Sequence, residues 1–373
     1  MHLADFVNGN AYKPDDFGER GYRVVRIRQL LDESAEFDLA PVPDRPVWLD
    51  DGDLVFSWSA TLAVRFWHRG KALLNQHLFR VDVHPIVEKR WFRYVLDEGV
   101  QRLMPLMHGS AMTHITIDML KSLTIDVPSL PDQSAIADYL DRETARIDAL
   151  IAAKRRLTEL AKDAATSELL SVLPANFPDA ARPFRRVARK VLRPAPSVLP
   201  VITAFRDGHV MRRDRRREEG FTQSEDYSGY QVVERGQIVF HGLDGFAGAV
   251  GVAEDDGMCS PVYHVCNALG GCSAEYLAQA LRSLALGGYL ELQAGNVRQR
   301  AVDMRNWEKL ARIPIPMVGP DQQAEIARRY LERRSWMEHV VSKLDRQVAL
   351  LQEHRQALIT AAVTGELDIP QAA

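Results

Sequence analysis

The second half of the amino-acid sequence repeats the first. Gly52-Asp53-Leu54-Val55-Phe56 recurs as Gly236-Gln237-Ile238-Val239-Phe240, and Asp132-Gln133-Ser134-Ala135-Ile136-Ala137 recurs as Gln322-Gln323-Ala324-Glu325-Ile326-Ala327. Matching residues lie 184 to 190 positions apart. A repeat of about 185 residues is far longer than the repeats of a solenoid and has the size of a whole domain. The sequence therefore predicts two similar domains with internal pseudo-two-fold symmetry.

Each half is predicted to end in a long helix, because apolar residues recur there at alternating spacings of four and three. In the second half these residues are Tyr330, Met337, Val341, Leu344, Val348, Leu351 and Leu358. In the first half they are Ile136, Leu140, Ile147, Leu150, Leu157 and Leu160. The spacing is typical of a coiled-coil seam.

A seam this narrow needs a partner, so we expect the two helices to pack on each other. An antiparallel pair is favoured, because the chain after Leu170 must travel back to begin the second domain. Parallel pairing and a helix pair inside an ordinary core are the alternatives. With the repeat, this predicts an α+β chain of two similar mixed α/β domains joined by two long helices that form an antiparallel coiled coil.

The expected boundaries follow from the prolines that precede each helix. The first domain covers residues 1–130, the first spacer helix 131–173, the second domain with a basic linker 174–317, and the second helix with a C-terminal tail 318–373. Alternating β-branched residues predict strands, and longer apolar periods predict helices. The main segments are strands at Tyr22–Ile27, Leu54–Trp58, Leu123–Val127, Gln231–Val233 and Ile238–Phe240, and helices at Ile86–Gln101 and Ala274–Leu286.

Charge is distributed unevenly, although the net charge is only −3. Residues 182–217 hold twelve Arg or Lys and two Asp, whereas residues 32–53 hold eight acids and a single Arg. Such asymmetry creates one surface that attracts phosphate. A solvated basic face without a nucleic-acid partner is the alternative interpretation.

Residues typical of catalysis or of metal binding do not form recognisable motifs. Gly242, Gly245, Gly248 and Gly251 lack the Lys-Ser or Lys-Thr of a phosphate loop and are expected to form turns. The three cysteines, Cys259, Cys266 and Cys272, lack zinc-ligand spacing and are expected to be buried reduced thiols. The N-terminus has no signal-peptide pattern, and no apolar run is long enough to span a membrane. These features predict a cytoplasmic binding protein rather than an enzyme.

Several motifs carry a resemblance to a known family. They are Gly109-Ser110 with His114-Ile115, the segment 132–137 that opens the first helix, and the ending at residues 355–368. In these motifs the sequence resembles the specificity subunits of type I restriction-modification systems. The resemblance implies two target-recognition domains, each reading one half of a split site in double-stranded DNA, and two helices that act as a ruler between them.

The same resemblance implies partners. Two methyltransferase subunits would dock on the helices, and two restriction subunits would join for cleavage. The partners would use S-adenosylmethionine, ATP and Mg, and this subunit would hold no cofactor and no metal and would perform no catalysis. A coiled-coil scaffold that does not read DNA, or a self-sufficient nuclease, are the competing interpretations.

The sequence departs from the family pattern at two places. The family usually has a segment ahead of the motif seen here at Leu3–Gly9, so we expect this chain to lack part of the edge of its first domain. The two halves also differ, with Asn296 in place of Ser110 and Gln237 in place of Asp53. The resemblance therefore implies that the two domains contact DNA with different side chains.

Candidate DNA-binding residues are polar side chains expected in the turns of each domain. Arg and Lys pair with guanine, Asn and Gln with adenine, and most contacts go to phosphate. In the first domain the candidates are Arg65, Arg69, Lys71, Asn75, Gln76, His77, His108 and Ser110. In the second they are Arg212, Arg213, Arg215, Arg216, Arg217, Asn296, Arg298 and Arg300. We expect the arginine run to bind phosphate rather than to read bases.

Overall fold

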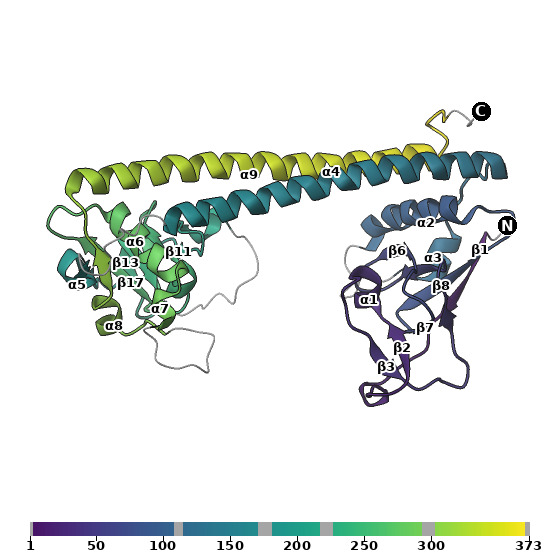
Figure 1. Ribbon diagram of the computed structural model, residues 1–373, viewed down its shortest axis with the longest axis horizontal. Helices are drawn as coiled ribbons and strands as arrows, with labels where there is room; N and C mark the ends of the chain where they lie inside the picture. Colours follow the sequence, from purple (N-terminus) through teal and green to yellow (C-terminus); the bar gives the residue numbers. More distant parts are fainter. Residues whose placement is uncertain (1–2, 108–114, 171–180, 217–226, 293–302, 370–373) are drawn as a thin grey trace. The chain divides into compact units, whose positions relative to one another are not determined.

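The computed structural model describes residues 3–107, 115–170, 181–216, 227–292 and 303–369. The chain forms two compact units, here called unit 1 (Met1–Lys154 with Arg346–Ala373) and unit 2 (Arg155–Asp345). Two long helices, α4 (Leu130–Leu170) and α9 (Pro320–Val363), each contribute to both units (Figure 1). Each unit thus contains one domain together with part of α4 and part of α9.

Unit 1 contains two four-stranded sheets. The first is antiparallel, in the order β1 (Ala4–Asn8), β8 (Leu78–Val83), β5 (Leu54–Ser57) and β6 (Ala63–Phe66). The second has the order β3 (Asp38–Ala40), β2 (Tyr22–Val25), β7 (Ala72–Leu74) and β4 (Trp48–Leu49), and its β2 and β7 are parallel. Short helical segments complete the domain: η1 (Pro14–Asp16), α1 (Ile27–Leu31), η2 (Met104–Met107) and α3 (Ile117–Lys121).

The core of unit 1 forms where helix α2 (Lys89–Leu103) packs on the first sheet (Figure 1). Trp91 and Phe56 are fully buried in this contact, as expected for large aromatic side chains. The opposite face of α2 contacts α4, where the hydroxyl of Tyr94 donates to Asp141 (2.7 Å). Helix α2 therefore links the sheet to the long helices.

Unit 2 repeats this architecture. Its main sheet is antiparallel, in the order β10 (Ala188–Val191), β17 (Tyr263–Ala268), β14 (Ile238–His241) and β15 (Val250–Val252). Helix α6 (Ala274–Leu286) packs on it as α2 does in unit 1. The sheets β1-β8-β5-β6 and β10-β17-β14-β15 have the same strand order along the chain, so the predicted duplication is confirmed.

Smaller elements surround this core in unit 2. Three two-stranded ribbons pair β9 (Ala181–Pro183) with β18 (Pro314–Pro316), β11 (Ile202–Ala204) with β12 (Val210–Arg212), and β13 (Gln231–Val233) with β16 (Gly257–Cys259). The short helical segments are α5 (Phe184–Val187), η3 (Arg213–Arg215), η4 (Gly245–Ala247), α7 (Tyr289–Leu292) and α8 (Trp307–Ala311). The ribbon β9-β18 brings the two ends of the domain together, beside the start of α9.

A buried glutamine joins each long helix to its domain. In unit 1 the Gln133 side chain accepts from the backbone N–H of Glu88 (2.7 Å), the residue before α2, and donates to the Pro128 carbonyl (2.9 Å). In unit 2 the Gln323 side chain accepts from the backbone N–H of Ser273 (3.0 Å), before α6, and donates to the Val318 carbonyl (2.9 Å). The repeated sequence motif thus performs the same structural task twice.

The two long helices run antiparallel. Within unit 1 the beginning of α4 packs against the end of α9, with Ala137 and Leu140 in one core with Ile359 and Val363. Arg355 of α9 forms an ion pair with Asp148 of α4 (3.0 Å). The predicted pairing is therefore confirmed.

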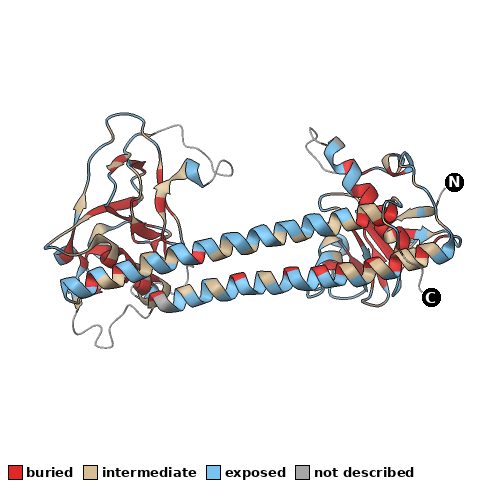
Figure 2. Ribbon diagram, turned by 90° about the horizontal axis from the view of Figure 1, so that it is seen from above, coloured by how far each residue is buried: buried red, intermediate tan, exposed pale blue. Residues whose placement is uncertain are grey.

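Both long helices carry a stripe of less exposed residues (Figure 2). The stripe of α9 agrees with the predicted seam, whereas that of α4 agrees with it at Leu140 and Ile147 but not in its later part. The expected seam residues Leu150, Leu157 and Leu160 are about half exposed, at 46%, 54% and 51%. The buried positions of α4 instead follow Leu140, Thr144, Ile147, Ile151 and Thr158. The prediction followed the leucines, whereas Ile151 and Thr158 occupy the seam beside Leu150 and Leu157 and leave these leucines on the outside.

The strand predicted at Leu123–Val127 is wrong, because these residues form no regular secondary structure. The corresponding segment of unit 2 is β18, which pairs with β9 ahead of the first strand of its sheet. Within the described residues of unit 1, no strand lies ahead of β1 to pair with residues 123–127. Extended backbone without a partner is not a strand.

Replacing Gln133 by Ala should lower the free energy of unfolding by roughly 2–4 kcal/mol, because it leaves a buried N–H and a buried carbonyl without partners. Gln133 is 1% exposed. Urea unfolding of the whole chain, followed by tryptophan fluorescence, measures this. Gln352→Ala, at an exposed position of α9, is the matched control and should change stability by less than about 0.5 kcal/mol. Equal effects of the two substitutions would contradict the anchoring role.

Stability should also depend on the protonation of His264. Its Nε2–H donates to the Met304 carbonyl (2.8 Å), and its buried Nδ1 has no hydrogen-bond partner in the described part of the chain. Burial lowers the pKa of His264. The unfolded chain then binds the proton more readily, so stability should fall as the pH drops below about 6.5 and level off below the lowered pKa.

Urea unfolding between pH 5 and 8 tests this dependence. His264→Gln keeps a donor for Met304 and should flatten the loss of stability at low pH. His68→Gln, at an exposed histidine of unit 1, should leave the loss unchanged. An identical pH profile for the His264 variant and the unaltered chain would disprove the assignment.

Candidate nucleic-acid interface

The turn between β6 and β7 holds two candidates in different roles. Arg69 donates to the backbone carbonyls of Ala35 (2.9 Å) and Gln29 (3.3 Å), and its guanidinium lies 4.1 Å from the ring centre of Phe37. Lys71 is exposed, with its ammonium 4.8 Å from the ring centre of Trp48. Arg69 therefore shapes the domain, whereas Lys71 is accessible to a ligand.

The turn between β7 and β8 separates its candidates in the same way. Asn75 is buried, and its side-chain oxygen accepts from the backbone N–H of His77 (3.3 Å). Gln76 is half-buried, and His77 is exposed, with Nδ1 3.1 Å from the Ser59 hydroxyl. Asn75 thus fixes the turn that presents the other two. Arg65, on β6, is exposed and contacts the backbone carbonyl of Val64 (2.9 Å).

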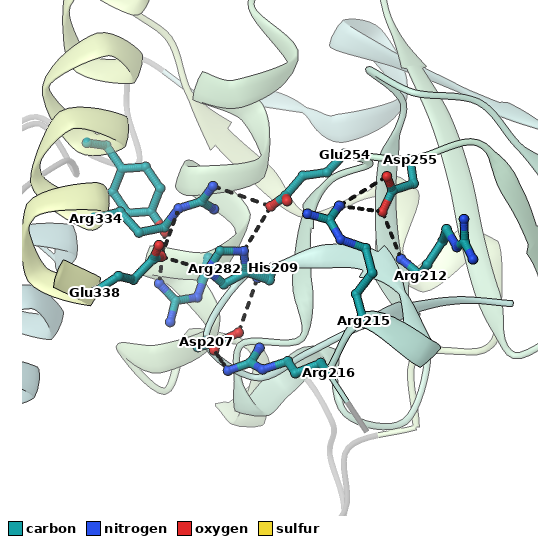
Figure 3. A network of polar contacts seen from close by, with 11 residues as sticks. Asp207, His209, Arg212, Arg215, Arg216, Glu254, Asp255, Arg282, Arg334 and Glu338 are labelled. Carbon is teal, nitrogen blue, oxygen red and sulfur yellow. Dashed lines mark hydrogen bonds and ion pairs between the residues drawn. The ribbon is translucent and has the colours of Figure 1, made fainter. Parts of the chain in front are cut away.

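In unit 2 most of the described arginine run is paired with acids (Figure 3). Arg212 donates to Asp214 (2.6 Å), and Arg215 makes two contacts to Asp255 (2.9 and 3.1 Å). Arg216 is paired with Asp207. The arginines are therefore less available to phosphate than their density in the sequence implies.

The acids in these pairs are held ionised. Hydrogen bonding from the Arg212 side chain lowers the pKa of Asp214. The Arg212 backbone N–H and then the Arg215 side chain lower the pKa of Asp255. Each ion pair is at least partly exposed, so its contribution to stability is small. A phosphate can compete for the same guanidinium groups.

Arg213 differs from its neighbours. Its Nε donates to the Thr203 hydroxyl (3.2 Å), and within the described residues it forms no ion pair with an acid. Its positive charge is therefore not neutralised locally. Of the described members of the run, Arg213 is the best placed for a phosphate contact.

A histidine connects this region to helix α9. The Nδ1 of His209 lies 2.8 Å from Glu254, and its Nε2 lies 2.6 Å from Glu338 of α9 (Figure 3). Arg334 reaches the same two carboxylates, at 3.5 and 3.6 Å. This group holds the β11-β12 turn against the helix. The sequence does not reveal this group, because its residues are far apart in the chain and form no motif.

Six candidates lie outside the described residues: His108, Ser110, Arg217, Asn296, Arg298 and Arg300. They fall in segments 108–114, 217–226 and 293–302. The structure neither brings them to the interface nor separates them from it.

The cysteines agree with the expectation for reduced thiols. Cys259 and Cys266 are buried, Cys272 is partly buried, and all are free. Burial raises the pKa of Cys259 and of Cys266 to about 12, which makes both thiols unreactive. Among the residues that the structure describes, no group of acids, histidines and cysteines is arranged to hold a metal ion. In the same residues, no helix is long and apolar enough to cross a membrane.

Comparison with known sequences gives two matches. Residues 47–159 match the family described as Type I restriction modification DNA specificity domain. The chain is 24% identical over 164 residues to the Type I restriction enzyme EcoBI specificity subunit of Escherichia coli. That match covers 43% of this chain and 34% of the relative, so the chain spans about a third of the length of the curated relative it matches.

Comparison with solved structures shows the fold. A chain from a study of complex assembly and conformational transition of the type I R-M system has a TM-score of 0.70 and 14% identity, with 98% of both chains covered. The HsdS subunit from Thermoanaerobacter tengcongensis has a TM-score of 0.47 and 15% identity, over 87% of this chain and 84% of that one. Residues 47–159 therefore match the type I restriction modification DNA specificity domain, and the chain shares the fold of a chain from a type I R-M system.

Proposed function

We propose that this chain is the DNA-specificity subunit of a type I restriction-modification complex, in which each domain reads one half of a bipartite duplex site. The observation that carries the proposal is the repetition of one architecture. The sheets β1-β8-β5-β6 and β10-β17-β14-β15 have the same strand order. Each domain is attached to a long helix through an equivalent buried glutamine, Gln133 in unit 1 and Gln323 in unit 2. Two copies of one reading domain suit a target with two short parts.

The proposed contact surface of unit 1 is formed by its exposed turns. Lys71, Gln76 and His77 lie in these turns, and Arg65 lies on the neighbouring strand β6. Turns held by a rigid sheet are suited to present side chains to DNA. Arg69 and Asn75 act indirectly in this proposal, because they hold the turns in shape. His108 and Ser110 remain candidates for base contacts.

The proposed surface of unit 2 centres on the arginine run. Arg213 contacts phosphate first, and Arg212, Arg215 and Arg216 join it by exchanging a carboxylate for a phosphate. Arg217, Asn296, Arg298 and Arg300 remain candidates in the neighbouring segments. Most of these contacts position the domain, since phosphate contacts carry no direct sequence information.

The proposed partners are two methyltransferase subunits, joined for cleavage by two restriction subunits. Helices α4 and α9 carry large apolar side chains that are about half exposed, which supports docking on them. These are Leu150, Leu157, Leu160, Trp336 and Leu350. The partners would use S-adenosylmethionine, ATP and Mg, and the chain itself would be non-catalytic. Such a complex acts on cellular DNA, which places the chain in the cytoplasm.

Exchanging residues 183–313 for the same segment of a relative with another specificity should change one half of the methylated site only. Both junctions lie at the ribbon β9-β18, where Pro183 faces Pro314 and Phe184 donates to the Ile313 carbonyl (2.9 Å), so the inserted domain closes on itself. Methylome sequencing of a host that carries the exchanged subunit and its partners measures the result. A change in both halves would refute independent reading by the two domains.

Replacing Arg213 by Ala should weaken binding to cognate and random duplexes alike and lower the slope of log K against log salt by about one. Arg215→Ala should have a smaller effect, because Asp255 already neutralises Arg215. Asp255→Asn should strengthen binding, since it frees Arg215. Fluorescence anisotropy over a range of salt concentrations measures all three. If Arg213→Ala weakened binding only to the cognate duplex, Arg213 would read a base instead.

A further inference from the structure

A cavity of about 750 Å³ lies within unit 2. Its walls come from the last part of α4, from α9 and from the β11-β12 turn, and every lining residue belongs to residues 155–345. The volume falls in the range of small-molecule sites. None of the predicted site residues except Arg216 lines it, so it is separate from most of the proposed DNA-contact surface.

One part of the wall is strongly basic. Seven lining residues carry a positive charge and two carry a negative charge, Asp207 and Glu338. Five of the seven cations are paired with acids: Lys162 with Glu159, Arg206 with Asp244, Arg216 with Asp207, Arg329 with Glu325 and Arg334 with Glu254. Another part is apolar, with Leu169 from α4 and Ile326, Met337 and Val341 from α9. A cavity with both kinds of wall favours an anion that has an apolar or planar body.

Arg282 of α6 is one of the cations that line this cavity, and it lies in the polar network beside Arg334 and His209 (Figure 3). It donates to the Tyr330 hydroxyl (3.3 Å) and to the Arg206 carbonyl (3.2 Å), both neutral acceptors. Gly208 leaves room for it, because a Cβ there would lie 3.0 Å from the Arg282 Nε. At this residue φ is +93°, a conformation that glycine adopts without strain. The backbone is therefore shaped around a guanidinium whose charge neither contact neutralises.

Comparison of α6 with the equivalent helix α2 of unit 1 shows a reversal of charge at one position. Helices α2 and α6 begin after Glu88 and Ser273, so Asp97 of α2 corresponds to Arg282 of α6. Burial raises the pKa of Asp97, and the charges of Arg355, Arg65 and Arg93 oppose this rise. Unit 1 thus supplies a carboxylate to its arginines from within the chain. Unit 2 has Arg282 at the same position, and among the described residues its hydrogen-bond acceptors are the neutral Tyr330 hydroxyl and Arg206 carbonyl.

We propose that this cavity is a binding site for a small phosphate-bearing organic anion of the nucleoside phosphate class. The phosphate takes the place that the Asp97 carboxylate has in unit 1 and lies against Arg282 and its basic neighbours. Guanidinium groups bind phosphate through paired hydrogen bonds and are well suited to this contact. The base lies against the apolar wall formed by α4 and α9.

Isothermal titration calorimetry of the full chain at low salt, with ATP, AMP and inorganic phosphate as probes, tests the proposal. Both nucleotides should bind, and inorganic phosphate should bind at least tenfold more weakly because it cannot use the apolar wall. Arg282→Gln should weaken nucleotide binding at least tenfold, and Arg282→Lys should restore part of it. Arg329→Gln, on the exposed rim of the cavity, should weaken it severalfold without disturbing the fold.

Arg193→Gln is the matched control, because it removes the same charge from a surface ion pair with Glu234 (2.6 Å) outside the cavity. It should leave nucleotide binding unchanged. The proposal fails if the unaltered chain binds none of the probes at millimolar concentration, or if both cavity variants bind as tightly as the unaltered chain. It also fails if Arg193→Gln weakens binding as much as Arg282→Gln, or if Arg282→Gln weakens duplex DNA binding instead. Loss of the small-molecule site leaves the proposed DNA-reading function untouched.

Discussion

The structure depends on one buried amide at the start of each long helix. Gln133 and Gln323 each join a proline-marked turn, the beginning of a long helix and the beginning of the helix that covers a sheet. Both side chains are almost fully buried, so each hydrogen bond is made where water cannot replace it. A rigid joint at this point transmits the orientation of a helix to its domain. The proposed reading of two half-sites depends on that property, because a flexible joint would let the two contacts vary in spacing.

Beyond this joint the two copies have diverged in charge. Glu98 of α2 accepts from Thr360 (2.6 Å) and Gln356 (2.9 Å) of α9, whereas Ser283, at the corresponding position of α6, donates to the Leu169 carbonyl. The neighbouring position changes from an acid to an arginine. The same backbone architecture thus contacts the long helices through different chemistry in each unit. Duplication preserved the geometry and left the side chains of each copy free to change.

The sequence predicted those helices and strands that depend on the local spacing of apolar residues or on the internal repeat. The span of α6 and the strand at Gln231–Val233 agree with the structure because their apolar spacing sets both type and length. The outward position of Leu150 and Leu157 could not be predicted, since it depends on Ile151 and Thr158, which occupy the seam in their place. A hydrophobic period identifies a helix reliably, but the face that is buried depends on the shape of the partner.

The sequence predicted which residue types form the candidate site, but it did not predict which of their charges are neutralised by acids. The arginine run is evident in the sequence, yet Asp255, which neutralises Arg215, lies 40 residues further along the chain. Because such pairs exist before DNA arrives, each phosphate contact in the proposed interface must displace a carboxylate. The net gain per contact is then smaller than for a free arginine. Since phosphate contacts carry no direct sequence information, this lowers the affinity for random DNA and for a cognate site by the same factor. The paired arginines thus reduce overall affinity, and discrimination between sites rests with the base contacts of the proposed interface.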